Sequence, residues 1–231
     1  MLIKRFDFEK LTRENINGKR YYITPAGEKL ASVTTILSHT KTAETKKALN
    51  NWKNRIGHRK AQDITTEAAG RGTRMHSFLE SYILNDKLEE AGSNIYSQQS
   101  RSMAQIIIEN GLKHVDEFYG SEVYLYNNPY YGGTTDSVAT YKGKLTILDF
   151  KQSNKPKKKE WIEDYFCQLC AYIECINVKF KENIKNGVVM MCSADYQYQQ
   201  FEVDESNFSY YSDMWWSKVE QYYQMLVEEE N

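Results

Sequence analysis

The sequence has little of several features that would point to particular classes of protein. Only 4 of its 231 residues are cysteine and 3 are proline, so neither a disulfide-rich secreted scaffold nor a proline-rich linker is expected. No apolar run approaches the ~20 residues that a membrane-spanning helix needs. Neither sign of charge dominates, with 30 Lys and Arg against 31 Asp and Glu. A protein that coats nucleic acid nonspecifically is therefore disfavoured, and any such contact must come from a local patch.

The first residues also lack the pattern of a targeting peptide. Residues 1–15 mix acidic with basic side chains and contain no apolar stretch, which disfavours secretory and organellar signals. The four cysteines all lie in the last third of the chain, and we expect them to be reduced thiols in a cytoplasm. What the chain does have is tyrosine, 18 residues of it. Such rings can give a core with polar handles, or surfaces on which bases stack.

Hydropathy and turn residues predict a mixed α/β fold without repeats or linkers. The expected elements are a hairpin at 20–33, a basic helical region at 35–59, helices at 73–84, 100–118 and 160–177, strands at 121–126, 134–141, 144–150, 187–193 and 196–203, and a helix from about 206. They predict a mixed central β-sheet flanked by helices, with an N-terminal hairpin and helical additions. We expect one domain, in which 1–70 holds the hairpin and the basic region and 71–231 holds the core.

The sharpest signal for chemistry is the segment 145–151, which reads LTILDFK. Alternate residues of a strand point to the same face, so Asp149 and Lys151 share a face at the end of an apolar strand. Burying a carboxylate there is costly unless a positive group meets it. An ion pair between Asp149 and Lys151 would meet that need, and a bound cation is the alternative.

A second carboxylate favours the cation. Asp136 follows the glycine pair 132–133 on the preceding strand, and the short turn at Gly143 makes the two strands antiparallel. Two carboxylates on neighbouring strands repel one another unless a divalent cation lies between them. Oxygen ligands, including the backbone carbonyl of Phe150, suit Mg²⁺ or Mn²⁺. Lys151 could then neutralise a phosphate or help to deprotonate a water.

A helical histidine is the third candidate. His76 lies at the border of the apolar stripe of the helix at 73–84, and Glu80 follows one turn later on the same face. A single helical histidine is most often a surface residue or a satisfied core residue. The glycine-rich segment before the helix, Glu80 and the two strand aspartates favour a functional role here.

Aromatic and basic residues near the helix at 160–177 form a candidate surface for nucleic acid. Four side chains recur at helical spacing beside the apolar stripe: Trp161, Tyr165, Gln168 and Tyr172. Such a face can contact phosphates and stack on bases. The preceding loop carries Lys157, Lys158 and Lys159, which can hold a phosphate backbone. Lysine runs are also typical of solvated loops and helix faces, and this interpretation stays open.

Taken in order, these motifs resemble the RecB-like branch of the PD-(D/E)XK nuclease superfamily. The matching elements are His76, the segment 132–136, Asp149-Phe150-Lys151 and Gln168-x-x-x-Tyr172. Further segments are similar to the mitochondrial genome maintenance exonucleases of that branch: 32–37, Trp52-Lys53 and 72–80. The resemblance covers roughly residues 32–172. Its acid-x-lysine motif takes the form Asp-Phe-Lys, which the family tolerates.

The resemblance implies a restriction-endonuclease-like core and a metal-dependent DNA exonuclease that hydrolyses phosphodiester bonds of single strands with a metal-activated water. Mg²⁺ or Mn²⁺ would be held by His76, Asp136, Asp149 and the Phe150 carbonyl, with Lys151 as the catalytic lysine and Glu80 beside them. It also implies DNA contacts from Gln168, Tyr172, Ser32, Thr34 and Lys53. Since no transit peptide is visible, a bacterial cell or a phage-infected host is the expected setting.

Other outcomes remain open. One alternative is a structure-specific or restriction-type endonuclease of the same superfamily, and another is a catalytically silent DNA-binding or recombination module. Some relatives carry an iron–sulfur cluster on four cysteines that bracket the core. No such cluster is expected here, because Cys167, Cys170 and Cys175 fall inside one predicted helix and no cysteine precedes the core.

Overall fold

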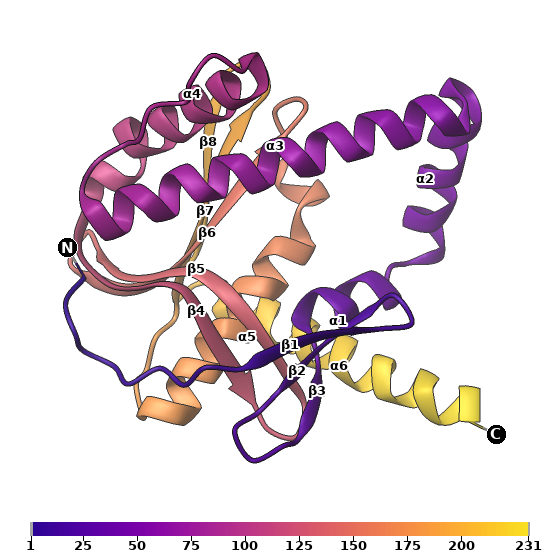
Figure 1. Cartoon of the computed structure of the whole chain (residues 1–231). Helices are drawn as coiled ribbons and strands as arrows, with labels where there is room; N and C mark the ends of the chain where they lie inside the picture. Colours follow the sequence, from indigo (N-terminus) through magenta and orange to yellow (C-terminus); the bar gives the residue numbers. More distant parts are fainter. Residues whose placement is uncertain (1, 231) are drawn as a thin grey trace.

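The centre of the fold is a five-stranded mixed β-sheet (Figure 1). The computed structural model describes residues 2–230. Strands β4 (Val115–Asn127), β5 (Tyr131–Tyr141) and β6 (Lys144–Ser153) form an antiparallel meander. Strand β7 (Asn186–Ser193) runs parallel to β6, and β8 (Tyr198–Val203) pairs antiparallel with β7. The mixed sheet expected from the sequence is confirmed.

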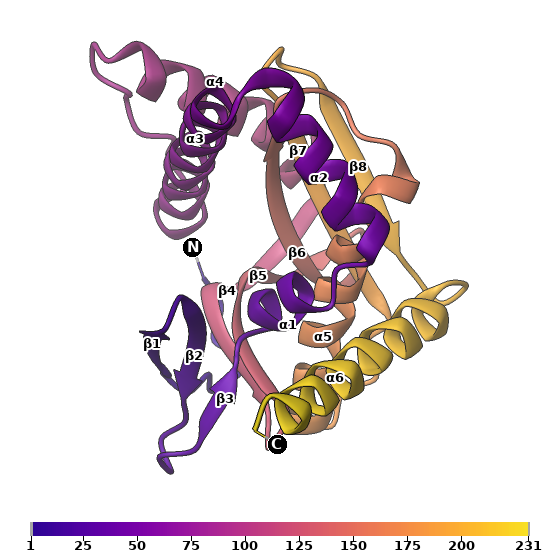
Figure 2. The ribbon, with the colours of Figure 1, turned by 90° about the vertical axis from the view of Figure 1, so that its right-hand side faces the viewer.

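Helices cover both faces of this sheet (Figure 2). On one face, α3 (His58–Asn85) and α4 (Ile95–Asn110) bury an apolar cluster against Leu148 and Phe150 of β6. On the other, α5 (Glu163–Phe180) and α6 (Phe208–Glu230) pack with α1 (Val33–His39) around a cluster that includes Ile147. Successive β6 residues therefore serve opposite cores, and Asp149 and Lys151 fall on the α5 side, as alternation predicts.

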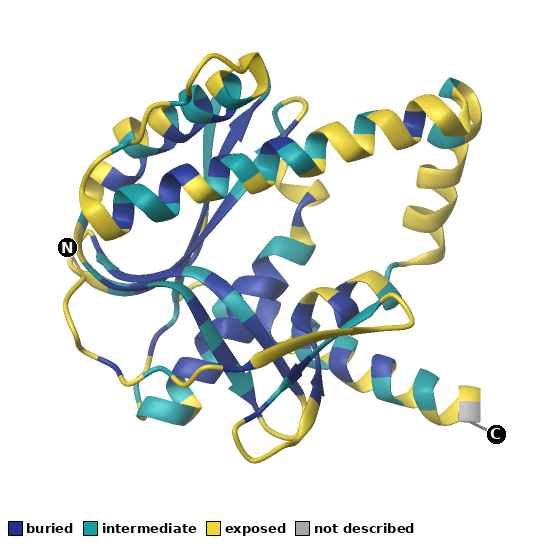
Figure 3. Cartoon of the chain, in the orientation of Figure 1, coloured by how far each residue is buried: buried dark blue, intermediate teal, exposed yellow. Residues whose placement is uncertain are grey.

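A small second sheet precedes these helices. It consists of β1 (Thr12–Ile16), β2 (Lys19–Ile23) and β3 (Lys29–Ala31), all antiparallel. An isolated parallel bridge between Ser32 and Gly132 fixes the start of α1 against β5. Helix α2 (Ala43–Ile56) then extends from the body with every residue at least partly exposed, as Figure 3 shows. The N-terminal region thus stands beside the central sheet.

Local sequence explains the helices nearest the centre. The Ser32 side chain accepts a hydrogen bond from the Thr35 N–H, which caps the first turn of α1. In α3, a stripe that includes Met75, Leu79 and Ile83 is almost wholly buried, as the i, i+4, i+8 spacing predicts. Helix α3 thereby presents a fixed face to the sheet.

The glycine-rich segment 70–73 does not begin a helix, which corrects the sequence prediction. Helix α3 runs through it without a break from His58. A Cβ at Gly72 would come within 3.2 Å of Gln152 Cγ, so the missing side chain allows the helix to lie close to β6. The predicted helical region at 35–59 is also not one continuous helix. It is divided into α1, α2 and the start of α3, with α2 capped by Thr42 and ended by Gly57 at a φ of 87°.

Three further element predictions are corrected. Helix α4 ends at Asn110, and residues 115–118 of the predicted helix belong to β4. A Cβ at Gly111 would lie 2.5 Å from Met190 Sδ, so this glycine permits close packing where the chain turns. Trp161 lies on a 3₁₀ turn before α5 instead of on that helix. The N-terminal sheet also contains β1, a strand that the sequence analysis did not predict. Its residues are all exposed, so its sequence shows no hydrophobic alternation.

Among the described residues, no helix is both long enough and apolar enough to cross a membrane. The four cysteines are free and buried, with Cys167, Cys170 and Cys175 on α5 and Cys192 on β7. Burial raises the pKa of the Cys192 thiol to about 12. These thiols are therefore protonated core side chains at neutral pH.

Candidate active site

A cleft of about 410 Å³ lies where the N-terminal sheet, α1, α3 and α5 meet strands β4 to β6. Charged residues from six elements line it, and they include the predicted chemical residues His76, Glu80, Asp136, Asp149 and Lys151. Four of the predicted DNA-contact residues line it as well: Ser32, Thr34, Gln168 and Tyr172. The fold thus brings residues as far apart in the sequence as Arg13 and Tyr172 into one cavity.

The floor of the cleft carries a row of three carboxylates on neighbouring strands. Extending the β5–β6 register by one residue from the pair Ser137–Leu148 places Asp136 opposite Asp149. In the β4–β5 register, residues 121 and 123 pair with 137 and 135, so Glu122 lies beside Asp136. The ligand atoms of Glu122 and Asp136 lie within 4.8 Å of each other. The three acids are therefore neighbours across β4, β5 and β6.

Asp149 and Lys151 form a buried ion pair at one end of the row. The Lys151 ammonium contacts Asp149 Oδ2, and their side chains are 19% and 2% exposed. Burial raises the pKa of Asp149 to about 6, although Lys151 pulls it down. Burial also lowers the pKa of Lys151, but Asp149 and Asp136 outweigh this effect and hold that pKa above its usual value. The lysine is therefore charged, and its Nζ also lies 5.1 Å from the centre of the Tyr165 ring.

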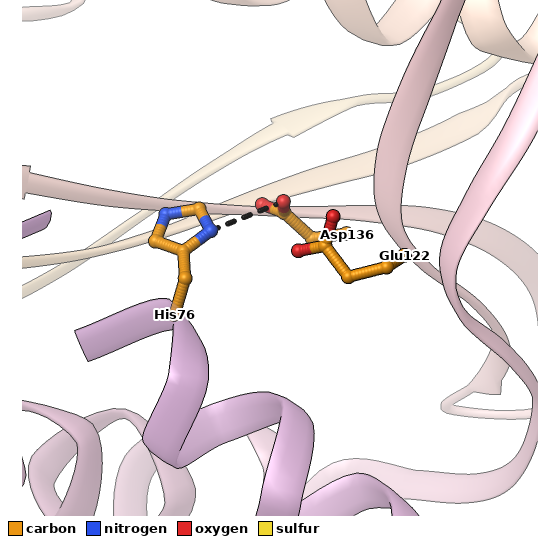
Figure 4. A group of neighbouring side chains, drawn as sticks. All are labelled: His76, Glu122 and Asp136. Carbon is orange, nitrogen blue, oxygen red and sulfur yellow. Dashed lines mark ion pairs between the residues drawn. The ribbon is translucent and has the colours of Figure 1, made fainter. Parts of the chain in front are cut away.

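His76 reaches the middle of the row from α3, as Figure 4 shows. Its Nδ1 lies 3.2 Å from Asp136 Oδ1. The other oxygen of Asp136 accepts a hydrogen bond of 2.5 Å from the Phe150 N–H. Burial lowers the pKa of His76, but the charge of Asp136 more than compensates and raises it to about 9. The Asp136 carboxylate is thus held from two sides, by α3 and by β6.

Glu122 is the acid that the sequence did not reveal. Its carboxylate, His76 and Asp136 offer ligand atoms that all lie within 4.8 Å of one another (Figure 4). Its φ of 50° places it in the left-handed region, which few non-glycine residues adopt. Burial, together with Asp136, raises the pKa of Glu122 to about 7. Pairing the predicted strands 121–126 and 134–141 in register would have placed it opposite Asp136.

The donors in the cleft fit a hard divalent cation. Carboxylate oxygens and one imidazole are a ligand set suited to Mg²⁺ or Mn²⁺. Asp149 Oδ2 is buried against the Lys151 ammonium. A divalent cation on this carboxylate would share it with Lys151. The role of the Phe150 carbonyl as a ligand stays a prediction. The centre of the Phe150 ring lies 6.3 Å from the centre of the His76 ring.

Close packing of α5 on β5 explains the glycines before Asp136. A Cβ at Gly133 would lie 2.6 Å from Tyr172 Oη, so only glycine leaves room for this ring. Tyr172 is 2% exposed and Gln168 is 9% exposed. Both side chains therefore belong to the cleft wall, with only their edges available to a ligand.

A basic wall from the N-terminal sheet is a second feature that the sequence did not reveal. Arg13 of β1 and Arg20 of β2 line the same cleft as the acids. Tyr22 stands beside them, and its hydroxyl lies 3.0 Å from Thr134 Oγ1 of β5. The Arg20 backbone is fixed by Thr35, whose Oγ1 accepts from the Arg20 N–H and donates to its carbonyl. The wall is thereby attached to both α1 and the central sheet.

The remaining predicted contact residues lie outside the lining that the described residues form. Lys53 is on α2, beside a separate small pocket that it shares with His58. Trp161 is 63% exposed, and the Lys158 ammonium lies 5.4 Å from its ring centre. The Lys157 backbone is held by the Gln199 side chain, and Lys159 packs its ammonium 5.6 Å from the Phe166 ring. Tyr165 contacts the site only by its ring, which lies against the Lys151 ammonium.

Comparison with known proteins gives related sequences but no matching protein-family model. The human mitochondrial genome maintenance exonuclease 1 is 27% identical over 178 residues, which cover 72% of this chain and 50% of that protein. The Xenopus tropicalis protein of the same name is 32% identical over 160 residues, covering 64% and 43%. The chain therefore spans about half the length of the curated relatives it matches.

A solved structure of a candidate exonuclease from Eubacterium rectale aligns with 68% of this chain and 66% of its own, at a TM-score of 0.49 and 14% identity. The sequence relatives confirm the resemblance that the motifs predict, and the PD-(D/E)XK motifs are consistent with it. By sequence, this chain resembles mitochondrial genome maintenance exonuclease 1.

Proposed function

We propose that this chain is a divalent-cation-dependent deoxyribonuclease that acts as an exonuclease on single-stranded DNA. The observation that carries the proposal is the paired strand acids Asp136 and Asp149, with charged Lys151 beside them and His76 above, inside one cleft. The name that the sequence relatives share supports an exonuclease. Because the chain spans about half of those relatives, its activity is proposed from its own residues.

The residues of the cleft divide the chemical work between them. His76, Asp136 and Asp149 would hold Mg²⁺ or Mn²⁺, with Glu80 close by. When bound, the cation would offset phosphate charge and lower the pKa of a coordinated water. Lys151 stays charged within the cleft, so it can stabilise the negative charge that grows on the phosphate as the bond breaks. Asp149 and the ring of Tyr165 hold that ammonium in place.

The walls of the cleft support a single strand as substrate. Arg13 and Arg20 can neutralise phosphates on one side, while Gln168 and Tyr172 approach from the other. The hydroxyls of Ser32 and Thr34, 3.1 Å apart, line the same cleft. A single strand can bend and unstack its bases to enter such a cavity. The exposed Lys53, Trp161 and lysines 157–159 would contact nucleotides beyond the reacting one.

The test compares linear and circular single-stranded DNA and duplex DNA, each with Mg²⁺, Mn²⁺ or chelator. We expect end-labelled linear single strands to be digested in the presence of the cation and circular single strands to stay intact. Cleavage of the circles would favour the endonuclease alternative. Binding without cleavage in both cations would favour the catalytically silent module. Full activity in chelator would contradict the cation requirement.

The contacts in the cleft do not indicate the biological setting of this protein. A bacterial or phage-infected cell, with a role in DNA repair or recombination, stays a prediction of the sequence. The names of the relatives place those proteins in mitochondria. Expression of the chain in its native host, with localisation by fractionation, would test the setting.

A further inference from the structure

We propose that a groove along α6 is the docking site for a basic amphipathic helix of a partner protein. The groove has a volume of about 1130 Å³, against about 410 Å³ for the cleft. Within the described chain, its lining comes from α6 and from the turn at Pro129 and Tyr130. The groove and the cleft share no lining residue. The proposal is therefore independent of the nuclease chemistry.

The floor of the groove is an apolar stripe along α6. Four residues line it at spacings of three and four, which place them on one side of the helix: Trp216, Val219, Tyr223 and Val227. Val219 is buried and Val227 is 61% exposed, so the stripe continues from the core to the surface. Tyr130, which is 43% exposed, adds a ring from the turn. Exposed apolar surface gathered in this way is typical of a protein interaction site.

Contacts between α6 and the turn fix the shape of the groove. The Tyr223 hydroxyl donates a hydrogen bond of 2.6 Å to the Tyr130 carbonyl. The Trp216 ring meets the Tyr130 ring edge to face, with 5.2 Å between the ring centres, and it also meets the buried ring of Tyr131 at 5.8 Å. The Tyr130 N–H in turn donates to the Asn127 carbonyl. A surface held in this way loses little conformational entropy when a partner binds.

The charged residues that line the groove are all acidic. They are Asp213, Glu220 and Glu228, and among the described residues no lysine or arginine lines it. The three acids are exposed and form no ion pair with any described residue. Lys218, the one lysine in the sequence of α6, pairs with Asp164 at 3.2 Å instead. A segment that covers the apolar stripe therefore gains from positive charges placed against these acids.

The arrangement of the acids indicates that the partner segment is a helix with one basic side. At ~100° per residue, Asp213, Glu220 and Glu228 lie ~40–120° around α6 from Trp216, so they follow one side of the stripe. They extend along about four turns of α6. A helix satisfies its own backbone groups against an apolar surface, whereas an extended segment would leave some of them unpaired. Its apolar anchors would recur at i, i+3 or i+4, and i+7.

The same charges disfavour two other occupants. Nucleic acid would bring phosphates to a groove that has three acids and, among the described residues, no basic side chain. Two copies of this chain that met through the same groove would bring three carboxylates each to one interface, where like charges repel. A basic segment of a different protein meets neither obstacle.

The test measures the binding of two labelled synthetic peptides to the full chain by fluorescence anisotropy. Both are helices of about five turns with leucine anchors at the spacing above, and they carry either lysines or glutamates along one side. We expect the lysine peptide to bind at least ~10-fold more tightly, with an affinity that falls as salt is added. Val227→Lys adds a positive charge in the groove and should weaken this binding at least ~5-fold. The matched control is Val178→Lys on α5, where the valine is 62% exposed; it should bind like the wild type.

Removal of the acids gives a second measurement at exposed positions. Asp213→Asn, Glu220→Gln and Glu228→Gln combined should abolish the preference for the lysine peptide, and thermal unfolding shows that each variant is folded. Equal binding of the two peptides by the wild type, or an unchanged affinity of Val227→Lys for the lysine peptide, overturns the proposal. Two further results would also overturn it in favour of another occupant. Self-association that Val227→Lys abolishes would identify a second copy, and tighter binding of single-stranded DNA by Val227→Lys than by Val178→Lys would identify nucleic acid.

Discussion

Replacing Asp149 by asparagine should stabilise the cation-free protein at neutral pH while it removes a proposed cation ligand. Asp149 is 1% exposed, and burial raises the pKa of its carboxyl to about 6 against the opposing pull of Lys151. When the pKa of an acid is higher in the folded than in the unfolded state, the acid does not reduce stability at a pH below its unfolded-state pKa. The cost grows as the pH rises and is complete above the folded pKa. The window therefore runs from about pH 4 to about pH 6.

The magnitude follows from the shift. From the ordinary value of 3.8 to about 6 is roughly two units, and each unit corresponds to about 1.36 kcal/mol. Ionising Asp149 in the folded, cation-free protein thus costs on the order of 3 kcal/mol at pH 8. Asparagine keeps the shape and removes the charge. Asp149→Asn should therefore be more stable than the wild type by about that amount at pH 8 and equally stable near pH 4.

Urea unfolding in chelator at the two pH values measures this difference. The matched control is Asp63→Asn, an exposed acid on α3, which should change the stability by less than about 0.5 kcal/mol. If Asp149→Asn is less stable than the wild type at pH 8, the pair of Asp149 with Lys151 is a net stabilising ion pair. That result would refute the reasoning, because the carboxylate would then need no cation.

Three further predictions concern the cleft. Lys151→Met should lower kcat by ~10²–10³ with little change in KM for DNA, because it removes a charge that acts mainly in the transition state; single-turnover rates and DNA affinity measure this, and an unchanged kcat would contradict it. Replacing Arg13 and Arg20 together by glutamine should flatten the log–log salt dependence of single-strand binding by ~0.7 for each lost phosphate contact, whereas an unchanged slope would remove the basic wall from the DNA path. Gly133→Ala places a Cβ 2.6 Å from Tyr172 Oη, so it should destabilise the fold by ~1–3 kcal/mol; a wild-type melting temperature would show that the ring can move aside.

The central sheet and its two aspartates could be predicted because they depend on local alternation. In segment 145–151, one face of the strand carries two apolar residues followed by Asp149 and Lys151. The structure places Ile147 in the core beside α5, and Asp149 follows it on the same face. The stripe of α3 and the position of His76 beside it were predictable for the same reason. These features need only the period of a strand or a helix.

The residues that were missed depend on distant pairing. Glu122 becomes a neighbour of Asp136 only through the β4–β5 register, and of His76 only because α3 crosses the sheet. Arg13 lies on β1, whose five residues are all exposed and show no hydrophobic period. Gly72 was misinterpreted as a helix boundary, since glycine marks both chain breaks and close packing, and only the contact with Gln152 distinguishes them.

The most direct test of the central claim is the rate of nucleotide release from linear single-stranded DNA before and after the divalent cation is removed. The wild type should release nucleotides in Mg²⁺ or Mn²⁺, stop when chelator is added and resume when the cation is restored. Under the same conditions, folded Asp149→Asn should bind the DNA and release almost nothing. Unchanged release in chelator, or full activity of Asp149→Asn, would contradict the account.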